Sequence, residues 1–311
     1  LPLPHHSRFR TQANLSKPTV LQAVIRERWS YIFLAVPLAL FAVFHLLPMA
    51  ATILLGFADY FPGGRPLWVG FENYRYALSD DLFWKALGNT ALYTTGVVPA
   101  SILLSVILAH LIHGLRRTST QAFYKSAFYL PSVTSGAILA LVWLWIFNPT
   151  RGLLNYLVSF LGLGPYTWTS DPQMALPSLA LMAVIGGHGA AIVLLTAAMG
   201  SIPSSYYEAA RLDGAGAWRQ LWTITVPLLR PTLLYLMVTS TIFSFQVFTQ
   251  VLMMTSGGPH YATTTLVFLI FNDAFEYFDF GKAAAEATLL SLGLALIAVG
   301  QYKWLASDVE Y

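Results

Sequence analysis

Long apolar stretches dominate this chain and constrain its fold more than any other feature. A bilayer core about 30 Å thick needs about 20 apolar helical residues for each crossing. Six segments reach that length, and each is bounded by Pro, Gly or charged residues. They cover about 30–56, 88–113, 122–147, 174–200, 232–254 and 283–305. The sequence therefore predicts an all-α membrane protein with six transmembrane helices.

Composition supports this fold class. Only 10% of the 311 residues are charged and 56% are hydrophobic, whereas an ordinary soluble protein has about 25% charged residues. No polar stretch is long enough for a separate catalytic domain, and no cysteine is present to form a disulfide or a thiolate metal site. The pattern predicts one transmembrane domain, 29–311, preceded by a basic cytoplasmic tail, 1–28. The small net charge of +3 gives no indication of nucleic-acid binding.

The distribution of basic residues predicts the orientation. Lys and Arg are retained on the cytoplasmic side of membrane proteins. If the N-terminus lies inside, the inner segments hold twelve of the seventeen Lys and Arg residues and the outer segments hold five. We therefore expect both termini in the cytoplasm, with the polar loop 201–231 on the same side.

That loop carries a spaced motif. Glu208-Ala209-Ala210 is followed after three residues by Gly214, and after nine more by Ile224-Thr-Val-Pro227. This pattern resembles the EAA loop of permeases of ABC importers, with Val226 where that family usually has Leu. The resemblance extends over about 26–305 and favours the carbohydrate-type permeases, similar to the maltose and glycerol-3-phosphate importer subunits of the first type.

The resemblance implies a type I ABC importer permease fold and a set of partners. It implies a second homologous permease, a dimer of ATP-binding cassette ATPases, an extracytoplasmic solute-binding protein and the surrounding lipid, with no nucleic acid. ATP and Mg would be bound by the ATPase, so this chain would have no catalytic residue, metal or cofactor. The implied location is the bacterial or archaeal cytoplasmic (inner) membrane, which the chain crosses several times.

In the resembling family the loop forms a coupling helix that contacts the ATPase. Ser205 and Glu208 have the spacing of a capping box, which predicts a short helix from Tyr206. Asp213-Gly214 is a turn signal that should end this helix after about two turns, and a second short helix is expected over about 217–221. The candidate coupling residues are Tyr206, Tyr207, Glu208, Ala209, Ala210, Leu212, Asp213 and Gly214.

A sugar crossing a membrane needs hydrogen-bond partners and aromatic faces. Thr239, Phe243, Gln246 and Gln250 recur at spacings of four, three and four, which places them on one side of a helix in the fifth predicted span. These residues are the candidate substrate pathway. Hydrogen bonding between helices, without substrate contact, is the alternative explanation.

Two further polar residues occur in predicted spans. His188 has no companion at a metal-ligand spacing, so we interpret it as a helix-packing residue rather than a ligand. Glu286 lies near the outer end of the sixth span, where we expect it to reach water or to pair with Lys282 at helical spacing.

Other functions remain as alternatives. The chain lacks the Gly-x-x-x-x-Gly-Lys-Ser/Thr motif that cradles ATP phosphates and also lacks the usual hydrolase motifs, which argues against an enzyme. A secondary transporter should carry intramembrane charges and repeats, and few such charges occur here. A structural scaffold would not need the loop motif. Among importers, the solute remains open between a disaccharide, a longer oligosaccharide and a glycerol phosphate or related phosphodiester.

Overall fold

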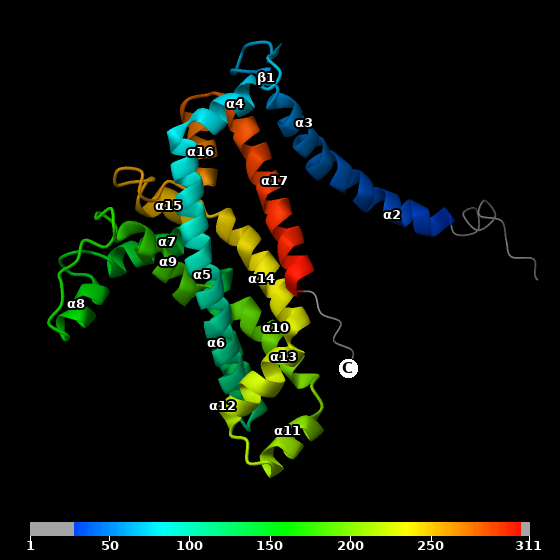
Figure 1. Cartoon of the computed structure of the whole chain (residues 1–311), viewed down its shortest axis with the longest axis vertical. Helices are drawn as coiled ribbons and strands as arrows, with labels where there is room; N and C mark the ends of the chain where they lie inside the picture. Colours follow the sequence, from blue (N-terminus) through cyan, green and yellow to red (C-terminus); the bar gives the residue numbers. More distant parts are fainter. Residues whose placement is uncertain (1–27, 306–311) are drawn as a thin grey trace, which may run out of the picture. The chain divides into compact units, whose positions relative to one another are not determined.

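The computed structural model of the chain describes residues 28–305, which are almost entirely helical (Figure 1). The chain divides into two compact units, 1–51 and 52–311, which we describe separately. The predicted basic tail, 1–28, lies outside the described residues except for its last residue. The predicted helical fold class is confirmed.

The described part of the first unit is one apolar helical run. It comprises α2 (Arg28–Phe41), the π-helical turn η1 (Ala42–Leu46) and the start of α3 (Leu47–Leu55). Together Trp29–Leu55 is long and apolar enough to cross a membrane, with a mean hydropathy of 2.3. A helix that is hydrophobic on all sides is typical of a membrane span.

The second unit opens with a small polar corner. Strands β1 (Ala58–Asp59) and β2 (Leu67–Trp68) pair antiparallel, and α4 (Glu72–Ser79) follows them. The Asn73 amide donates to the Ala58 carbonyl at 2.9 Å, which fixes α4 against β1. The long helix α5 (Asp81–His113) then begins at Asp80, whose carboxylate accepts from the Leu82 amide at 2.8 Å as an N-cap.

Two of the predicted spans are bent pairs of helices rather than continuous helices. Helices α6 (Thr118–Tyr129) and α7 (Gly136–Ile146) are joined through the 3-10 turn η2 (Leu130–Val133), and the chain bends by 98° between them. After α8 (Leu153–Ser159), the chain forms α9 (Ala175–Gly186) and α10 (Gly189–Gly200), which meet at 45°. The predictions of continuous helices over 122–147 and 174–200 are therefore wrong in this respect.

The bend between α9 and α10 lies where the chain packs closely against α6. Gly189 lies so close to α6 that an added Cβ would be 2.5 Å from the Tyr129 Cα, so only glycine fits there. His188 caps the start of α10 and is buried; its Nδ1 is 2.8 Å from the Ser105 hydroxyl of α5, and its Nε2 contacts the Val184 carbonyl. The interpretation of His188 as a helix-packing residue fits these contacts.

The remaining elements run from the polar loop back to the other end of the unit. The loop holds α11 (Ser204–Leu212), α12 (Ala217–Gln220), the π-helical turn η3 (Leu221–Thr225) and α13 (Val226–Leu228). They are followed by α14 (Arg230–Phe245), α15 (Thr249–Met254), α16 (Leu266–Phe271), the π-helical turn η4 (Asn272–Glu276) and α17 (Phe280–Leu305). The predicted span 232–254 is thus interrupted at 246–248.

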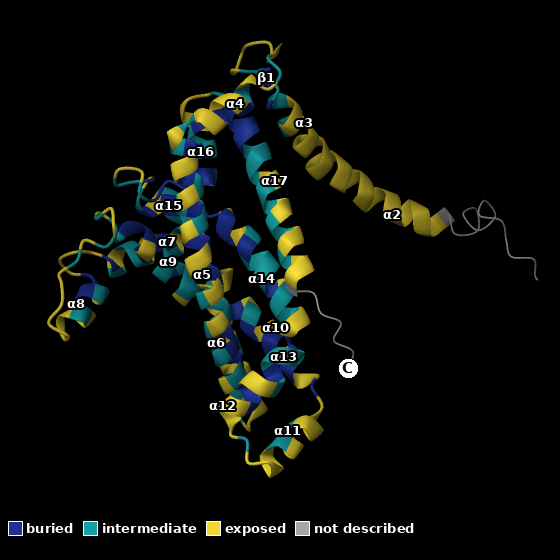
Figure 2. Ribbon diagram, viewed as in Figure 1, coloured by how far each residue is buried: buried dark blue, intermediate teal, exposed yellow. Residues whose placement is uncertain are grey.

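By length and composition, three helices of the described region could cross a membrane, or up to six if each bent pair counts as one span. Helix α5 is the centre of the second unit, where it packs against α9, α10 and α14 (Figure 1). The buried residues of these helices face one another, while their outward faces stay exposed and apolar (Figure 2). This pattern suits a bundle surrounded by lipid or by another apolar subunit.

The structure also corrects the prediction for Glu286. This side chain is completely buried and does not reach water, although it lies 3.7 Å from the Lys282 ammonium as the helical spacing predicted. The cause is tertiary packing, because α4 and η4 cover this part of α17.

Candidate functional site

The loop with the spaced motif forms a helical hairpin at one end of the second unit (Figure 1). Helix α11 ends at Leu212. Gly214 follows with a backbone φ of +77°, a conformation that residues other than glycine rarely adopt. The Ala215 amide then donates back to the Ala210 carbonyl at 2.8 Å, which closes the helix end. The predicted turn at Asp213-Gly214 and the predicted second helix, found at Ala217–Gln220, are both confirmed.

The start of α11 differs from the prediction. The helix begins at Ser204 with Pro203 as its cap residue, and no side-chain hydrogen bond caps it. The predicted capping box between Ser205 and Glu208 is therefore wrong. Pro203 sets the backbone direction in its place, since its fixed φ suits the entry to a helix.

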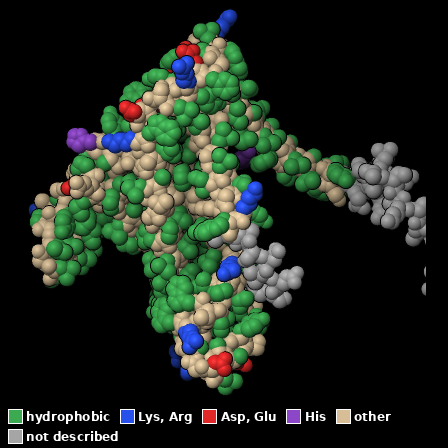
Figure 3. All heavy atoms as spheres, viewed as in Figure 1, with side chains coloured by type: hydrophobic (Ala, Val, Ile, Leu, Met, Phe, Trp, Pro, Cys, Tyr) green, Lys and Arg blue, Asp and Glu red, His purple; other side chains and the backbone are tan. Residues whose placement is uncertain are grey.

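Several loop residues project away from the bundle. Glu208, Ala209 and Asp213 are exposed, and the Leu212 side chain is 91% exposed. Tyr206 and Gly214 are also exposed, whereas Ala210 is half-buried. Charged side chains gather at the end formed by α11 and α12 (Figure 3). A highly exposed leucine beside small residues and a carboxylate is a suitable surface for another protein.

Other loop residues connect α11 to the bundle. The hydroxyl of the half-buried Tyr207 lies 2.9 Å from the Thr225 hydroxyl of η3. The side-chain amide of Gln220 donates to the Ala215 carbonyl at 2.7 Å. Buried Leu221 and Leu229 continue this contact into an apolar cluster with α5, α10 and α14. These contacts form a continuous path from α11 to the start of α14.

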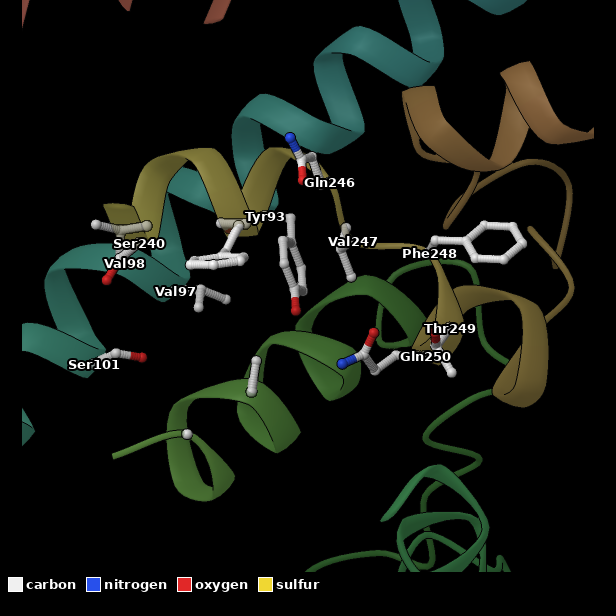
Figure 4. Close-up of a pocket in the computed structure, with 14 residues that line it drawn as sticks. Tyr93, Val97, Val98, Ser101, Ser240, Gln246, Val247, Phe248, Thr249 and Gln250 are labelled. Atoms are coloured by element: carbon white, nitrogen blue, oxygen red, sulfur yellow. The ribbon is translucent and has the colours of Figure 1, made fainter. Parts of the chain in front are cut away.

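The far end of α14 opens into a cavity. The helix stops at Phe245, and residues 246–248 are non-helical before α15 begins. The Thr265 hydroxyl donates to the Val247 carbonyl at 3.0 Å and so satisfies a backbone group that the break leaves free. A cavity of about 440 Å³ lies at this break (Figure 4).

The cavity is lined by hydroxyls, amides and aromatic rings. Its walls come from α5, from α9 and the break after it, from α14, and from the break before α15 together with α15 itself. The fourteen lining residues are Tyr93, Val97, Val98, Ser101, Ala183, Gly187, Ser240, Phe243, Ser244, Gln246, Val247, Phe248, Thr249 and Gln250. None of these fourteen residues is charged. Tyr93 from α5 and Gln250 from α15 point into the same space (Figure 4).

Three of the four predicted pathway residues meet at this cavity. Phe243, Gln246 and Gln250 line it, but they do so because the helix breaks between Phe245 and Thr249, not because they share one helical face. Gln246 is exposed. Thr239 lies outside the cavity lining, and its hydroxyl donates to the Tyr235 carbonyl one turn back at 2.7 Å.

Sequence reasoning missed the residues that reach the cavity from other elements. Tyr93 and Ser101 come from α5, which carries no polar periodicity that would mark them. Phe248 belongs to the break itself. No group of three or more His, Cys, Asp or Glu side chains that could hold a metal ion occurs within residues 28–305.

The second unit thus combines a bundle of apolar helices, a cavity lined by uncharged residues and an exposed helical hairpin at one end. Residues 101–311 match the binding-protein-dependent transport system inner membrane components. The chain belongs to this family, whose members are inner-membrane transport subunits.

Relatives over nearly the whole length agree. The chain is 31% identical over 286 residues to the probable ABC transporter permease protein YesP of Bacillus subtilis, covering 90% of this chain and 91% of YesP. It is 34% identical to the diacetylchitobiose uptake system permease protein NgcF of Streptomyces coelicolor, covering 83% of this chain and 77% of NgcF. It is 29% identical to the sn-glycerol-3-phosphate transport system permease protein UgpA of Escherichia coli, covering 93% of this chain and 98% of UgpA.

Solved structures show the same fold. A chain of a bacterial ABC transporter that imports the acidic polysaccharide alginate superposes with a TM-score of 0.79, covering 94% of this chain and all of that chain, at 20% sequence identity. A second structure of an alginate transporter, in complex with a periplasmic protein bound to an alginate pentasaccharide, matches with the same TM-score. The chain therefore has the fold of an ABC importer permease.

Proposed function

We propose that this chain forms one half of the translocation pore of an ATP-driven importer for an uncharged sugar, delivered by an extracytoplasmic binding protein. The observation that carries the proposal is the cavity at the end of α14, whose lining offers hydroxyls, amides and aromatic rings without a charge. Such a lining suits a sugar, because hydroxyl groups pair with its polar edges and aromatic faces cover its apolar ring surface.

The proposed assembly has four kinds of member. This chain pairs with a second homologous permease, and both rest on a dimer of ATPase subunits that bind ATP and Mg. The relative from Bacillus subtilis is a probable ABC transporter permease, and an alginate ABC transporter has been solved in complex with an alginate-bound periplasmic protein, which supports this set of partners. Catalysis belongs to the ATPase, and this chain contributes no catalytic residue, cofactor or metal.

Coupling follows from the connection between the hairpin and the cavity. In the proposed cycle, closure of the ATPases moves α11 through contacts with Tyr206, Glu208, Ala209, Leu212 and the turn at 213–214. The Tyr207 to Thr225 contact and the apolar cluster transmit this movement to α14. Because α14 ends at the cavity, its displacement changes the cavity lining and opens it toward the bound solute.

The uncharged cavity favours a neutral solute over the alternatives. The relative from Streptomyces coelicolor takes up diacetylchitobiose, an uncharged disaccharide, whereas the Escherichia coli relative transports glycerol 3-phosphate. A phosphate or an acidic polysaccharide would gain from Arg or Lys in the lining. The glycerol-phosphate alternative therefore requires the second permease to supply the positive charge. The other alternative, a self-contained secondary transporter, differs in the energy source, because it would need no ATPase.

The topology proposed is six spans with both termini in the cytoplasm, so that 29–311 is one transmembrane domain and 1–28 is a cytoplasmic tail. Each bent helix pair then counts as one crossing, and the loop 201–231 faces the ATPase. The distribution of Lys and Arg supports this orientation. The predicted location is the cytoplasmic membrane of a bacterium or archaeon.

Single cysteines test this orientation cleanly, because the chain has none of its own. A membrane-impermeant thiol reagent is added to intact cells, after permeabilisation of the outer membrane where the cells have one. We expect the reagent to label Thr150→Cys in the connection after α7 and to leave Ser119→Cys at the start of α6 unlabelled. Both residues are exposed. Inside-out vesicles should reverse the pattern. Labelling of both positions from one side would refute the proposed topology.

Loss of one amide in the cavity should weaken solute recognition. We expect Gln246→Ala to reduce apparent solute affinity by about 2- to 10-fold, the effect of one lost hydrogen bond of about 0.5–1.5 kcal/mol. The measurement is the solute concentration for half-maximal uptake in reconstituted vesicles. Thr239→Ala is the matched control, because this hydroxyl binds its own helix outside the cavity. Equal behaviour of the two variants would place the solute contacts elsewhere.

A further inference from the structure

Four ionisable side chains from three segments meet at the end of the second unit where α4, α5 and α17 come together. Asp80 lies at the corner between α4 and α5, Asp273 lies in η4, and Lys282 and Glu286 lie one turn apart on α17. The Lys282 ammonium is 2.9 Å from an Asp80 oxygen, 3.1 Å from an Asp273 oxygen and 3.7 Å from a Glu286 oxygen. All three ion pairs therefore depend on one ammonium group.

This cluster is so deeply buried that any uncompensated charge in it is energetically costly. The exposed fraction of the side chain is 0% for Glu286, 6% for Asp273, 10% for Lys282 and 24% for Asp80. With every group ionised, three carboxylates surround one ammonium and leave a net charge of −2 in a region screened from water. Burying an unpaired carboxylate is so costly that such a group normally takes up a proton instead.

Asp80 is the carboxyl that the ammonium pairs with most closely. It makes the shortest contact with Lys282, and its other oxygen accepts from the Leu82 amide at 2.8 Å. Partial burial opposes ionisation, but the hydrogen bonds from Lys282 and Leu82 hold the pKa of Asp80 below its ordinary value. Asp80 is therefore ionised at neutral pH, and the excess negative charge belongs to Asp273 and Glu286.

These two carboxyl groups lie within hydrogen-bonding reach of each other. The Oδ2 of Asp273 lies beside the Lys282 ammonium, but both oxygens of Glu286 are buried without a hydrogen-bond donor. Two ionised carboxylates are acceptors only, so they repel each other in this position. A single proton between them would remove one charge and turn the repulsion into a hydrogen bond.

No other charged group in the described residues supplies the missing charge. Besides the cluster itself, the titratable residues on the elements packed against α17 are Asp59 of β1, Glu72, Tyr74, Arg75 and Tyr76 of α4, Glu276 of η4, and Arg230 and Tyr235 of α14, with Asp279 just before α17. Arg75 is exposed and forms no ion pair with the cluster, and the buried Tyr74 hydroxyl has no hydrogen-bond partner. Tyr76 presents its ring to the Lys282 ammonium at 5.1 Å.

We propose that Glu286 keeps its proton at neutral pH and donates it to Asp273, so that the cluster is a buried proton-binding site. Glu286 is assigned the proton because it is the most buried carboxyl and the farthest from the ammonium. The site joins η4 and the corner at Asp80 to the first turns of α17. Loss of the proton loosens this junction, so the site makes this end of the permease sensitive to alkaline pH.

The sign of the pH effect follows from proton release on unfolding. In the unfolded chain Glu286 loses its proton above about pH 4.3, whereas the folded chain retains it at neutral pH. Each unfolding event then releases one proton, so the unfolding equilibrium constant rises about tenfold per pH unit from this source. Stability should fall as pH rises from about 5 until the folded protein itself loses the proton. Glu286→Gln removes this dependence.

Infrared spectroscopy tests the proposal directly. The complete complex, with its partner permease and ATPases, is placed in lipid nanodiscs, and the carbonyl band of protonated carboxylic acids is recorded between pH 6 and pH 10. We expect a band at neutral pH that shifts in D₂O, disappears at high pH and is absent in Glu286→Gln. It should remain in Glu276→Gln, a matched control on the exposed side of η4.

Two further variants keep the test decisive. In Asp273→Asn the band should persist at a shifted frequency, because the proton stays on Glu286 while its acceptor changes. The apparent melting temperature of Glu286→Gln should depend less on pH than that of the wild type, whereas Glu276→Gln should follow the wild type. A band that survives Glu286→Gln and is lost in Asp273→Asn would overturn the assignment, as would a wild-type complex without the band.

Discussion

Replacing Lys282 with methionine is expected to be among the most damaging single changes in this chain. The substitution keeps most of the side-chain volume but leaves Asp80, Asp273 and the fully buried Glu286 without their shared ammonium. Removing one partner of a buried ion pair typically costs about 3–5 kcal/mol, because the remaining charge stays desolvated. We expect a large fall in apparent melting temperature and poor accumulation of the protein in the membrane.

Lys303→Met lies on the same helix at an exposed position and should leave stability nearly unchanged. Neutralising two of the stranded carboxyls in Lys282→Met/Asp273→Asn/Glu286→Gln should restore part of the loss, since Asp80 is then the one carboxyl of the cluster left charged. A Lys282→Met protein as stable as Lys303→Met would contradict the role given to this cluster.

Reversing the charge of Glu208 is expected to abolish transport while leaving the fold intact. Glu208 is exposed on α11 and its side chain has no hydrogen bond or ion pair within the described residues, so its substitution by lysine should disturb the chain little. If α11 docks on the ATPase, the reversal places a wrong charge at that contact, and loss of a charged interface contact costs about 2–5 kcal/mol. At 1.4 kcal/mol for each tenfold, uptake should fall well over tenfold.

Glu276→Lys is the matched comparison for this prediction, because it reverses an exposed charge on η4 at the other end of the second unit. Uptake of labelled sugar and the amount of ATPase that co-purifies would be measured for both variants. We expect Glu208→Lys to lose uptake at normal membrane levels, and Glu276→Lys to retain it. Unimpaired uptake by Glu208→Lys would remove Glu208 from the coupling role.

The sequence predicted the helical elements well because bilayer thickness fixes the length of an apolar segment. Spans near 30–56 and 283–305 are found as Trp29–Leu55 and Phe280–Leu305. The turn at Gly214 was also predictable, since the local Asp-Gly signal requires no distant contact. Features that depend on hydropathy and on adjacent residues are therefore readable from the chain alone.

The breaks in the helices were not predictable in the same way. Residues 246–248 are apolar or amide residues without Gly or Pro, and their non-helical conformation depends on Thr265, eighteen residues away from Val247. Gly187-His188-Gly189 offered a local signal, but the close approach of Gly189 to α6 is tertiary. Hydropathy averages across such breaks and predicts one continuous helix.

The cavity and the charged cluster show the same limit. Three cavity residues were found from a helical spacing that the structure does not contain, while Tyr93 and Ser101 of α5 gave no signal. Lys282 and Glu286 were readable as a pair, but their burial required Asp80 and Asp273, which lie 202 and 9 residues from Lys282 along the chain. Contacts between distant segments were the information that the sequence pattern lacked.

The most direct test of the proposed function is the ATPase activity of the purified complex. The chain would be co-purified with its natural partners, reconstituted in lipid, and assayed with and without the sugar-loaded binding protein. The proposed coupling predicts that the loaded binding protein stimulates ATP hydrolysis in the wild type and fails to do so in Glu208→Lys. Absence of any co-purifying ATPase, together with solute uptake by this chain alone, would contradict the importer function and support a secondary transporter.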